Sequence, residues 1–242
     1  MVAVSYKIKD LLDRIMGWLA FIVLSPIFWL VAAFIRLDSP GPVFFRQVRI
    51  GKDGRPFVAY KFRTMVDKAT TMGLGFNLEP NDSRITRVGN FLRETSLDEL
   101  PQLFNIIKGE MSLVGPRPTQ AYQVLAYNTF QRRRLLVKPG ITGWAQINGR
   151  NTITWEERFE LDVWYVDHWS LKLDLYILVR TLRVWARRED LYAPDISHDI
   201  GNPEDEEKAI EIFSSQTKFS EAFRSGHSST HHIESSRNLR ED

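Results

Sequence analysis

The feature that most constrains this chain is an uncharged, strongly apolar stretch from Ile15 to Ile35, close to the N-terminus. As a helix rising ~1.5 Å per residue, it is long enough to cover the ~30 Å hydrocarbon layer of a bilayer. A secretory signal peptide has a shorter apolar core, and no small-residue cleavage site follows before Arg36. We therefore expect the stretch to stay attached and to meet a membrane.

The middle of this stretch holds Ser25 and Pro26, and proline bends a helix because it removes a backbone hydrogen bond. Basic residues flank the stretch on both sides, so the positive-inside rule gives no preferred direction. The rule is satisfied best if both ends remain on the cytoplasmic side. The residues leave two structures open: a kinked span, and a re-entrant helix that enters and leaves one leaflet.

Local patterns after this stretch predict a small β-hairpin followed by helices. Residues 42–50 and 55–64 are rich in Val, Phe and Tyr and flank the turn Gly51–Gly54, which is typical of two paired strands. Helical spacing of apolar residues returns in residues 90–93, 98–108, 120–136, 155–169 and 171–188. We therefore predict the α+β class: a mostly helical, membrane-associated domain with an N-terminal hydrophobic helix, a small β-hairpin and interfacial amphipathic helices.

The last of these helical segments has two distinct faces. One carries Leu175, Leu178, Leu182 and Trp185, and another carries Arg180, Arg183 and Arg187. The helix could lie on anionic lipid headgroups, or its basic face could simply be solvated.

Composition divides the chain and excludes several classes of protein. The net charge of +2 combines a basic body with an acidic segment after about residue 200. The excess of positive charge in the basic body allows anionic partners but is too dilute to indicate binding of nucleic acid. The absence of Cys excludes a disulfide scaffold, a thiolate zinc site and a cysteine nucleophile. We expect a membrane-inserted helix in residues 1–38, a candidate catalytic domain in 39–200 and a disordered acidic tail in 201–242.

The adjacent acids Asp98 and Glu99 are the most suggestive candidates for chemistry. Ser96 with Glu99 three residues later fits a capping box, so helix capping alone explains much of the pattern. The same carboxylates at a helix start, near Arg93, would also suit a site for phosphate and a divalent metal. Neighbours on a helix point roughly 100° apart, so the two acids would have separate roles. One would attack phosphorus, and the other would hold Mg²⁺.

Three further basic residues could contact phosphate. Arg117 lies in the stiff turn Gly115–Pro118 and could clamp a phosphate through two parallel hydrogen bonds, although such a turn is usually only a loop. Lys61 and Arg63 occupy alternate positions of the second predicted strand and so share a face. They are either a phosphate-facing pair or a solvated strand edge.

At this point the chain resembles the bacterial sugar transferases of the small, monotopic phosphoglycosyl transferase type. The resemblance runs from about residue 7 to 190 and does not rest on one motif. It takes in, in order, Ser25-Pro26, residues 39–43 (SPGPV), 47–51 (QVRIG), 60–65 (YKFRTM), 92–103, 108–118, 138–143 (KPGITG) and 148–151 (NGRN).

This resemblance implies transfer of a sugar 1-phosphate from a UDP-sugar to undecaprenyl phosphate, with release of UMP, at the cytoplasmic face of the bacterial inner membrane. It assigns Asp98 as the nucleophile, which becomes phosphoglycosylated, and Glu99 as a ligand of Mg²⁺. Arg93 and Arg117 would contact phosphate groups, and Lys61 and Arg63 are weaker candidates for the same role.

The resemblance also favours the re-entrant helix, bent at the Ser-Pro pair. The chain lacks the larger multi-spanning N-terminal region that some relatives carry, which suggests a minimal catalytic unit.

Two alternatives remain beside the transferase. The same acids and arginines could serve a metal-dependent phosphohydrolase of lipid diphosphates. A non-catalytic membrane scaffold of a polysaccharide assembly complex would use Asp98 and Glu99 only as caps. The aromatic residues between Trp155 and Trp185 could pair two copies in a homo-oligomer or anchor the chain at the membrane. The identity of the sugar is not readable from these residues.

Overall fold

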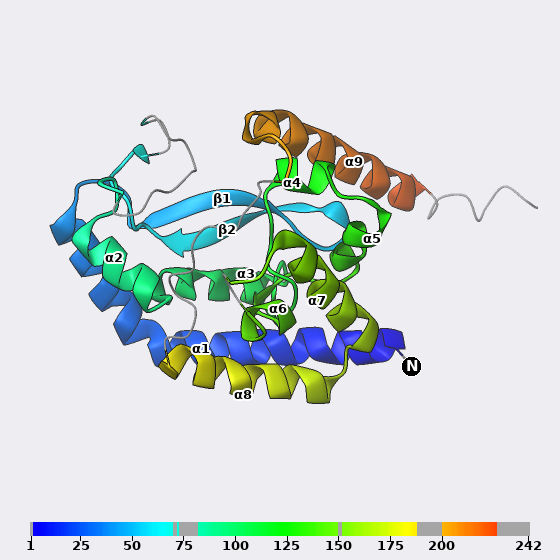
Figure 1. The fold of residues 1–242 in the computed structure, drawn as a ribbon, viewed down its shortest axis with the longest axis horizontal. Coiled ribbons are helices and arrows are strands. Elements are labelled where there is room, and N and C mark those ends of the chain that lie inside the picture. The colour runs from blue at the N-terminus through cyan, green and yellow to red at the C-terminus, as the bar shows by residue number, and fades with distance from the viewer. Residues whose placement is uncertain (1, 70–71, 73–81, 150–151, 188–199, 227–242) are drawn as a thin grey trace, which may run out of the picture.

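The computed structural model describes residues 2–69, 72, 82–149, 152–187 and 200–226, and within them the chain is mostly helical (Figure 1). The α-helices are α1 (Val2–Asp38), α2 (Arg87–Glu94), α3 (Leu103–Lys108), α4 (Ala121–Leu125), α5 (Thr129–Arg132), α6 (Trp144–Ile147), α7 (Trp155–His168), α8 (Leu171–Arg187) and α9 (Glu206–Gly226). Short 3-10 helices are η1 (Lys52–Gly54), η3 (Leu97–Gln102), η4 (Arg133–Leu136) and η5 (Pro203–Asp205). The strands are β1 (Phe44–Ile50), β2 (Pro56–Phe62), β3 (Ser112–Val114) and β4 (Gly140–Thr142).

The N-terminal helix α1 is long and changes direction along its length, as Figure 1 shows. Pro26 lies inside it, and the Ser25 hydroxyl donates to the Ile22 carbonyl at 2.8 Å. Both features favour a bend, because the proline removes a backbone donor and the serine competes for a backbone acceptor. The segment Tyr6–Asp38 is long and apolar enough to cross a membrane. Only 17% of its most apolar window is buried, so this helix mostly points its apolar side chains away from the core.

The predicted hairpin is confirmed. β1 and β2 pair antiparallel, with Phe44 opposite Phe62 and Ile50 opposite Pro56. β2 buries Phe57 and Ala59 on one face because successive side chains alternate across a strand. A second, smaller parallel pair joins β3 to β4.

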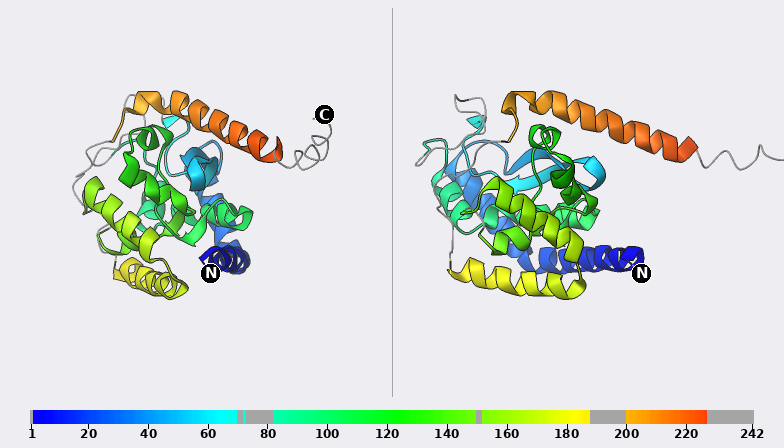
Figure 2. Two further views of the ribbon diagram at one scale, coloured as in Figure 1. Left: turned by 90° about the vertical axis from the view of Figure 1, so that its right-hand side faces the viewer. Right: turned by 45° about the vertical axis from the view of Figure 1, so that its right-hand side comes forward.

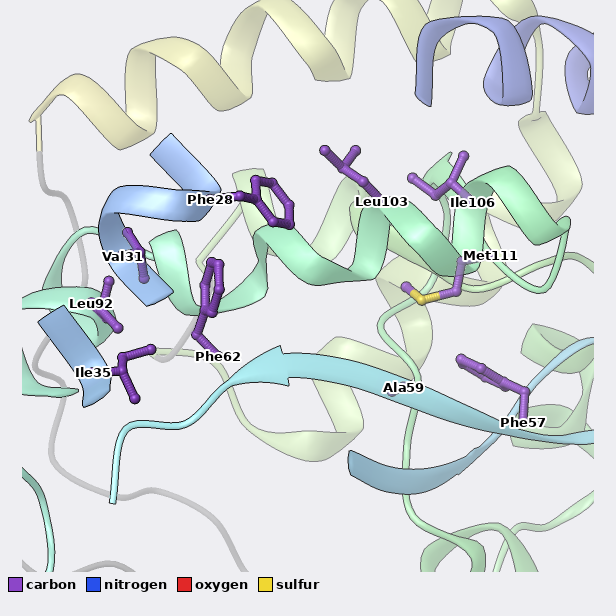
Figure 3. Close-up of a cluster of buried hydrophobic side chains, with 10 residues drawn as sticks. All are labelled: Phe28, Val31, Ile35, Phe57, Ala59, Phe62, Leu92, Leu103, Ile106 and Met111. Carbon is purple, nitrogen blue, oxygen red and sulfur yellow. The ribbon is translucent and has the colours of Figure 1, made fainter. Parts of the chain in front are cut away.

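The main core lies between the second half of α1, β2 and α3, as Figure 3 shows. Its buried members are Phe28, Val31, Ile35, Phe57, Ala59, Phe62, Leu92, Leu103, Ile106 and Met111. Leu103 and Ile106 belong to α3, which continues directly from η3. The helix that meets the membrane in our prediction is therefore packed against the segment that follows the acid pair.

The first half of α1 lies beside α8 in all three views (Figures 1 and 2). Lys9 of α1 donates to Asp174 of α8 at 2.6 Å, and both residues are buried. The opposite face of α8 points outward, since Leu175 is 63% and Leu182 69% exposed. An outward apolar face favours the interfacial helix over a merely solvated basic one.

The sequence predicts one continuous helix over residues 120–136, and this prediction is wrong because the helix is interrupted. The structure breaks the segment into α4, α5 and η4. Asn128 caps α5, because its side chain accepts from the backbone N–H of Gln131 at 2.9 Å. A new N-cap begins a new helix.

The expectation of a disordered tail is also wrong for residues 203–226, while residues 227–242 lie outside the described part of the chain. η5 and α9 follow Asn202, whose side chain caps η5. α9 buries Ala209 and Phe213 against a second core that includes Ile50, Val124 and Phe159. Apolar residues four apart give this acidic helix one face that packs. Figures 1 and 2 place α9 on the side of the molecule away from α1 and α8.

Candidate active site

The acid pair Asp98–Glu99 lies in η3, immediately after a sharp turn from α2. Ser96 makes this turn in the left-handed conformation (φ 56°), and its side chain does not cap η3. The capping box that the sequence suggests is therefore absent. The Glu99 side chain does not form part of a cap and makes other contacts instead.

Glu99 makes hydrogen bonds to two basic residues from distant parts of the chain. Its Oε1 accepts from Lys61 Nζ of β2 at 2.7 Å and from Arg117 Nη2 at 2.5 Å. Its Oε2 accepts from Arg117 Nη1 at 3.2 Å. Burial alone would raise the pKa of Glu99, but Arg117 and Lys61 outweigh it and hold that pKa well below its ordinary value. Glu99 is thus an ionised carboxylate that two cationic side chains hold in place.

Asp98 differs from its neighbour. Among the described residues, no hydrogen bond or ion pair engages its carboxylate. Burial raises the pKa of Asp98, and the charge of Glu99 adds to that rise, while Lys61, Arg117 and Arg93 oppose it. Two adjacent carboxylates with oppositely shifted pKa values are the arrangement expected for separate chemical roles.

Arg93 reaches the site from α2. Its Nε donates to the Thr64 hydroxyl at 2.9 Å, and its charge acts on Asp98. α2 sits close enough for this contact because of Gly89, where an added Cβ would lie 1.9 Å from the Thr64 carbonyl oxygen. The missing side chain at position 89 therefore lets α2 carry Arg93 to the acid pair.

Arg117 extends from a loop that is held by backbone hydrogen bonds of the two residues before it. The Gly115 N–H donates to the Thr142 carbonyl at 2.9 Å, and the Gly140 N–H donates to the Pro116 carbonyl at 3.0 Å. At Gly140 an added Cβ would lie 2.1 Å from the Gly115 nitrogen, so the two backbones approach this closely only because glycine has no side chain.

A buried ion pair supports the same loop from behind. Arg134 Nη2 donates to the Arg117 carbonyl at 2.9 Å and to Asp162 Oδ2 at 2.6 Å. Its Nη1 donates to the Tyr127 hydroxyl at 2.7 Å. Arg134 is 3% and Asp162 1% exposed, so this pair is inside the protein and positions the backbone of Arg117.

Beside Lys61 and Arg117 the structure has a cavity of about 220 Å³. Its wall is lined by Arg49, Ala59, Lys61, Gln102, Arg117, Pro118, Thr119, Gln120, Gln123, Arg134, Trp155 and Arg158. Five of these side chains are basic and none is acidic, and one is a tryptophan. The cavity is suited to an anion that also carries a flat ring.

Most of these wall residues were not found by sequence reasoning. Arg49 lies within the segment 47–51 that carries the family resemblance, so a signal existed without an assigned role. Arg134 and Arg158 sit in helical segments, and nothing in the sequence shows that either arginine faces inward. Burial, followed by the nearby charge of Arg117, lowers the pKa of Arg49 to about 10.

The structure places Arg63 away from the acid pair. Its guanidinium donates to the Ser39 carbonyl at 2.7 Å, the Ser39 hydroxyl at 2.9 Å and the Pro40 carbonyl at 2.7 Å. Arg63 is 6% exposed and holds the turn after α1. Lys61 and Arg63 therefore do not form a phosphate-facing pair. Lys61, Arg93, Asp98, Glu99 and Arg117 are the predicted residues that come together.

The donor set suits Mg²⁺ only in company with a phosphate-bearing ligand. No group of three His, Cys, Asp or Glu side chains able to hold a metal occurs within the described residues. Asp98 and Glu99 supply two carboxylates, and Mg²⁺ commonly takes one or two carboxylates while phosphates and waters complete its shell.

Sequence comparison identifies a family that covers most of the chain. A model of a family described as "Bacterial sugar transferase" matches residues 4–188. The chain belongs to the bacterial sugar transferase family. The matched region contains the acid pair, all the cavity residues and α8, whereas η5 and α9 lie beyond it.

Three relatives show the range of this family. An uncharacterized sugar transferase of Bacillus subtilis, EpsL, is 52% identical over 176 residues, covering 73% of this chain and 86% of the relative. A UDP-glucose:undecaprenyl-phosphate glucose-1-phosphate transferase of Xanthomonas campestris is 46% identical over 186 residues, which cover 72% of this chain and 37% of the relative. A UDP-N-acetylgalactosamine-undecaprenyl-phosphate N-acetylgalactosaminephosphotransferase of Aeromonas hydrophila is 41% identical over 182 residues, covering 73% and 43%. The chain thus spans less than half the length of the last two, and their names differ in the sugar.

Proposed function

We propose that this protein transfers a sugar 1-phosphate from a UDP-sugar to undecaprenyl phosphate at the cytoplasmic face of the bacterial inner membrane. The observation that carries the proposal is the acid pair itself. Asp98 is without a hydrogen-bonding partner among the described residues, while Glu99 is held by Lys61 and Arg117 at the edge of a cationic cavity. The names of the relatives support the same two substrates.

The reaction proceeds in two displacements at one phosphorus atom. Asp98 attacks the phosphorus that bears the sugar, the bond to the bridging oxygen breaks, and UMP leaves with that oxygen. An oxygen of undecaprenyl phosphate then attacks the same phosphorus, and the Asp98 carboxylate is released. The product is undecaprenyl diphosphate sugar. The two anionic substrates never need to occupy the site together, so we expect ping-pong kinetics.

Basic residues around the acid pair stabilise the negative charges of the carboxylates and of the bound phosphates. Arg117 and Lys61 already hold Glu99, and Arg117 is 41% exposed at its side chain, so it can also turn toward a phosphate. Arg93 also acts on Asp98 and favours its charged form. Mg²⁺, held by Glu99 together with the diphosphate, would neutralise charge on the donor and on the departing UMP.

The membrane supplies the acceptor. We propose that α1 bends at Ser25-Pro26, re-enters one leaflet and returns to the cytoplasmic side, while the outward apolar face of α8 lies along the same surface. Trp18 and Trp29 of α1 are 53% and 79% exposed, as is usual for aromatic residues that sit in lipid or at its boundary. A lipid-anchored phosphate and a soluble nucleotide sugar can both reach an acid pair at this depth.

The test is UMP release by the detergent-solubilised full chain with Mg²⁺, a panel of UDP-sugars, and undecaprenyl phosphate present or absent. We expect one donor to support lipid-dependent turnover, and a stoichiometric burst of UMP without lipid. Asp98→Asn should abolish both. Asp53→Asn is the matched control, because Asp53 is exposed in the turn η1 with φ 58°, a conformation that Asn adopts equally well.

The other outcomes identify the competing functions. Phosphate release from a lipid diphosphate, with no sugar transfer, would indicate a phosphohydrolase. Normal glycan in cells that carry Asp98→Asn would indicate a scaffold and would overturn the catalytic role of this residue.

A further inference from the structure

The C-terminal segment Gly201–Gly226 lies outside the region matched by the family model, yet it packs against the wall of the cavity. Its helix α9 buries Ala209 (0% exposed) and Phe213 (4%) against Val124 of α4 and Ile50 of β1. Figure 1 shows α9 running across α4. The segment is therefore docked on the short helix α4.

α4 lies between α9 and the cavity. Gln120, just before α4, and Gln123 within it both line the cavity, and they are 9% and 6% exposed. α4 is only five residues long, so few of its backbone groups are fixed by the helix itself. Its position depends on what packs on its outer side.

One side chain of α9 makes this connection directly. Glu206 Oε2 accepts a hydrogen bond from the Tyr122 backbone N–H at 2.8 Å. This N–H lies in the first turn of α4, where no backbone carbonyl of the same helix is available to it. α4 has a local capping box, in which the Gln120 N–H donates to Gln123 Oε1 at 3.2 Å, and Glu206 adds a second cap from 84 residues further along the chain.

The charge of Glu206 is also felt in the cavity. Glu206 acts on Arg49, a wall residue that also senses Arg117 and Glu99. The next residue, Glu207, is exposed and has no such contact among the hydrogen bonds of the described chain. Position 206, and not the acidity of the helix in general, links α9 to the site.

We propose that Glu206 is a positioning residue for nucleotide binding: it caps α4 and so holds Gln120 and Gln123 in the wall of the cavity. The inference rests on the proposed function in that it takes the cavity to be the site of the nucleotide donor. It adds that a segment beyond the family domain completes that site.

The experiment measures the Kd of the full chain for UDP by titration calorimetry in detergent, and the KM and kcat for the UDP-sugar that supports turnover. The variants are Glu206→Ala and Glu206→Gln, with Glu207→Ala and Glu207→Gln as matched controls. We expect Glu206→Ala to raise Kd and KM about 10-fold, because the hydrogen bond to the Tyr122 N–H is lost, while kcat changes less than about twofold. Glu206→Gln should keep the wild-type Kd within about threefold, since its amide oxygen accepts from the same N–H.

Hydrogen exchange of the peptide that contains α4 gives a readout independent of binding. Glu206→Ala should speed exchange in α4 and leave the main core around Ile106 unchanged, and Glu206→Gln should not speed it. Wild-type affinity of Glu206→Ala for UDP would overturn the proposal. Equal losses of UDP affinity in Glu206→Ala and Glu206→Gln would also overturn it. The charge of Glu206, and not its hydrogen bond to α4, would then be responsible for the effect on binding. UDP binding without any UMP release would refute the proposed function while leaving this inference intact.

Discussion

Removing Asp162 should destabilise the protein far more than removing Asp167, although both acids belong to the same helix, α7. Asp162 is 1% exposed and pairs with Arg134, which is 3% exposed. Arg158 lies near enough for its charge to act on Asp162 as well. Asp167 pairs with Arg133 at the surface, where the two side chains are 40% and 42% exposed.

The expected magnitudes follow from this difference in burial. Breaking a buried ion pair by deleting one partner costs ~3–5 kcal/mol, because the remaining charge stays buried without compensation. An exposed pair contributes about 0–1 kcal/mol. In a domain of this size 1 kcal/mol shifts Tm by ~2–4 °C. Asp162→Ala should therefore lower Tm by roughly 6–20 °C, and Asp167→Ala by no more than about 4 °C.

The assay is thermal unfolding of each full-length variant in detergent, followed by tryptophan fluorescence. The double variant Arg134→Met with Asp162→Leu should regain most of the stability, because replacing a buried pair by apolar residues is often neutral. It should nevertheless turn over slowly, since the Arg117 carbonyl has lost its donor. Similar Tm shifts for the two single variants would refute the reasoning, and so would full activity in the double variant.

Three further outcomes are expected. Lys61→Met should move the acid limb of kcat/KM for UMP release to higher pH, because Lys61 favours the charged form of Asp98 and its loss raises that pKa further; an unmoved limb would exclude this coupling. Gly89→Ala should cost ~1–3 kcal/mol in thermal unfolding and lower kcat, because its Cβ meets the Thr64 carbonyl, whereas the exposed Asn90→Ala should cost about 0.5 kcal/mol or less. Single cysteines placed before residue 7 and after residue 52 should react with an impermeant thiol reagent from the same side of the membrane, and the chain has no other Cys to confuse the result. Labelling from opposite sides would refute the re-entrant helix.

The elements that sequence predicts well here are those with a local signal. The hairpin is marked by a glycine turn between two runs of β-branched and aromatic residues, and its strands were found in register around that turn. α7 begins after Thr154, where a capping box with Glu157 is readable in the sequence. The acid pair was singled out as two carboxylates at a helix start in a segment that contains Arg93, and the alternative interpretation, a capping box with Ser96, is wrong.

The cavity was not predictable in the same way. Arg49, Arg134 and Arg158 come from different elements, and only tertiary packing brings them together. Arg63 looked equivalent to Lys61, because alternate strand positions share a face. The strand ends at Phe62, however, and the Arg63 guanidinium donates to the turn after α1 instead.

The tail illustrates a different error. The acidic average over residues 201–242 concealed the helical spacing of Ala209 and Phe213, which was the signal that α9 packs.

The bend of α1 and the acid pair are parts of one packed unit. The residues after the Ser25-Pro26 pair, Phe28 and Val31, share a core with Leu103 and Ile106 of α3, and α3 continues directly from η3. The residues before the pair lie beside α8, through the buried contact of Lys9 with Asp174. A change in the angle of α1 would therefore move the α8 surface relative to η3. In the proposed function this core would set the depth at which the acid pair meets a lipid-anchored phosphate, so the bend in the helix and the chemistry at Asp98 are expected to vary together.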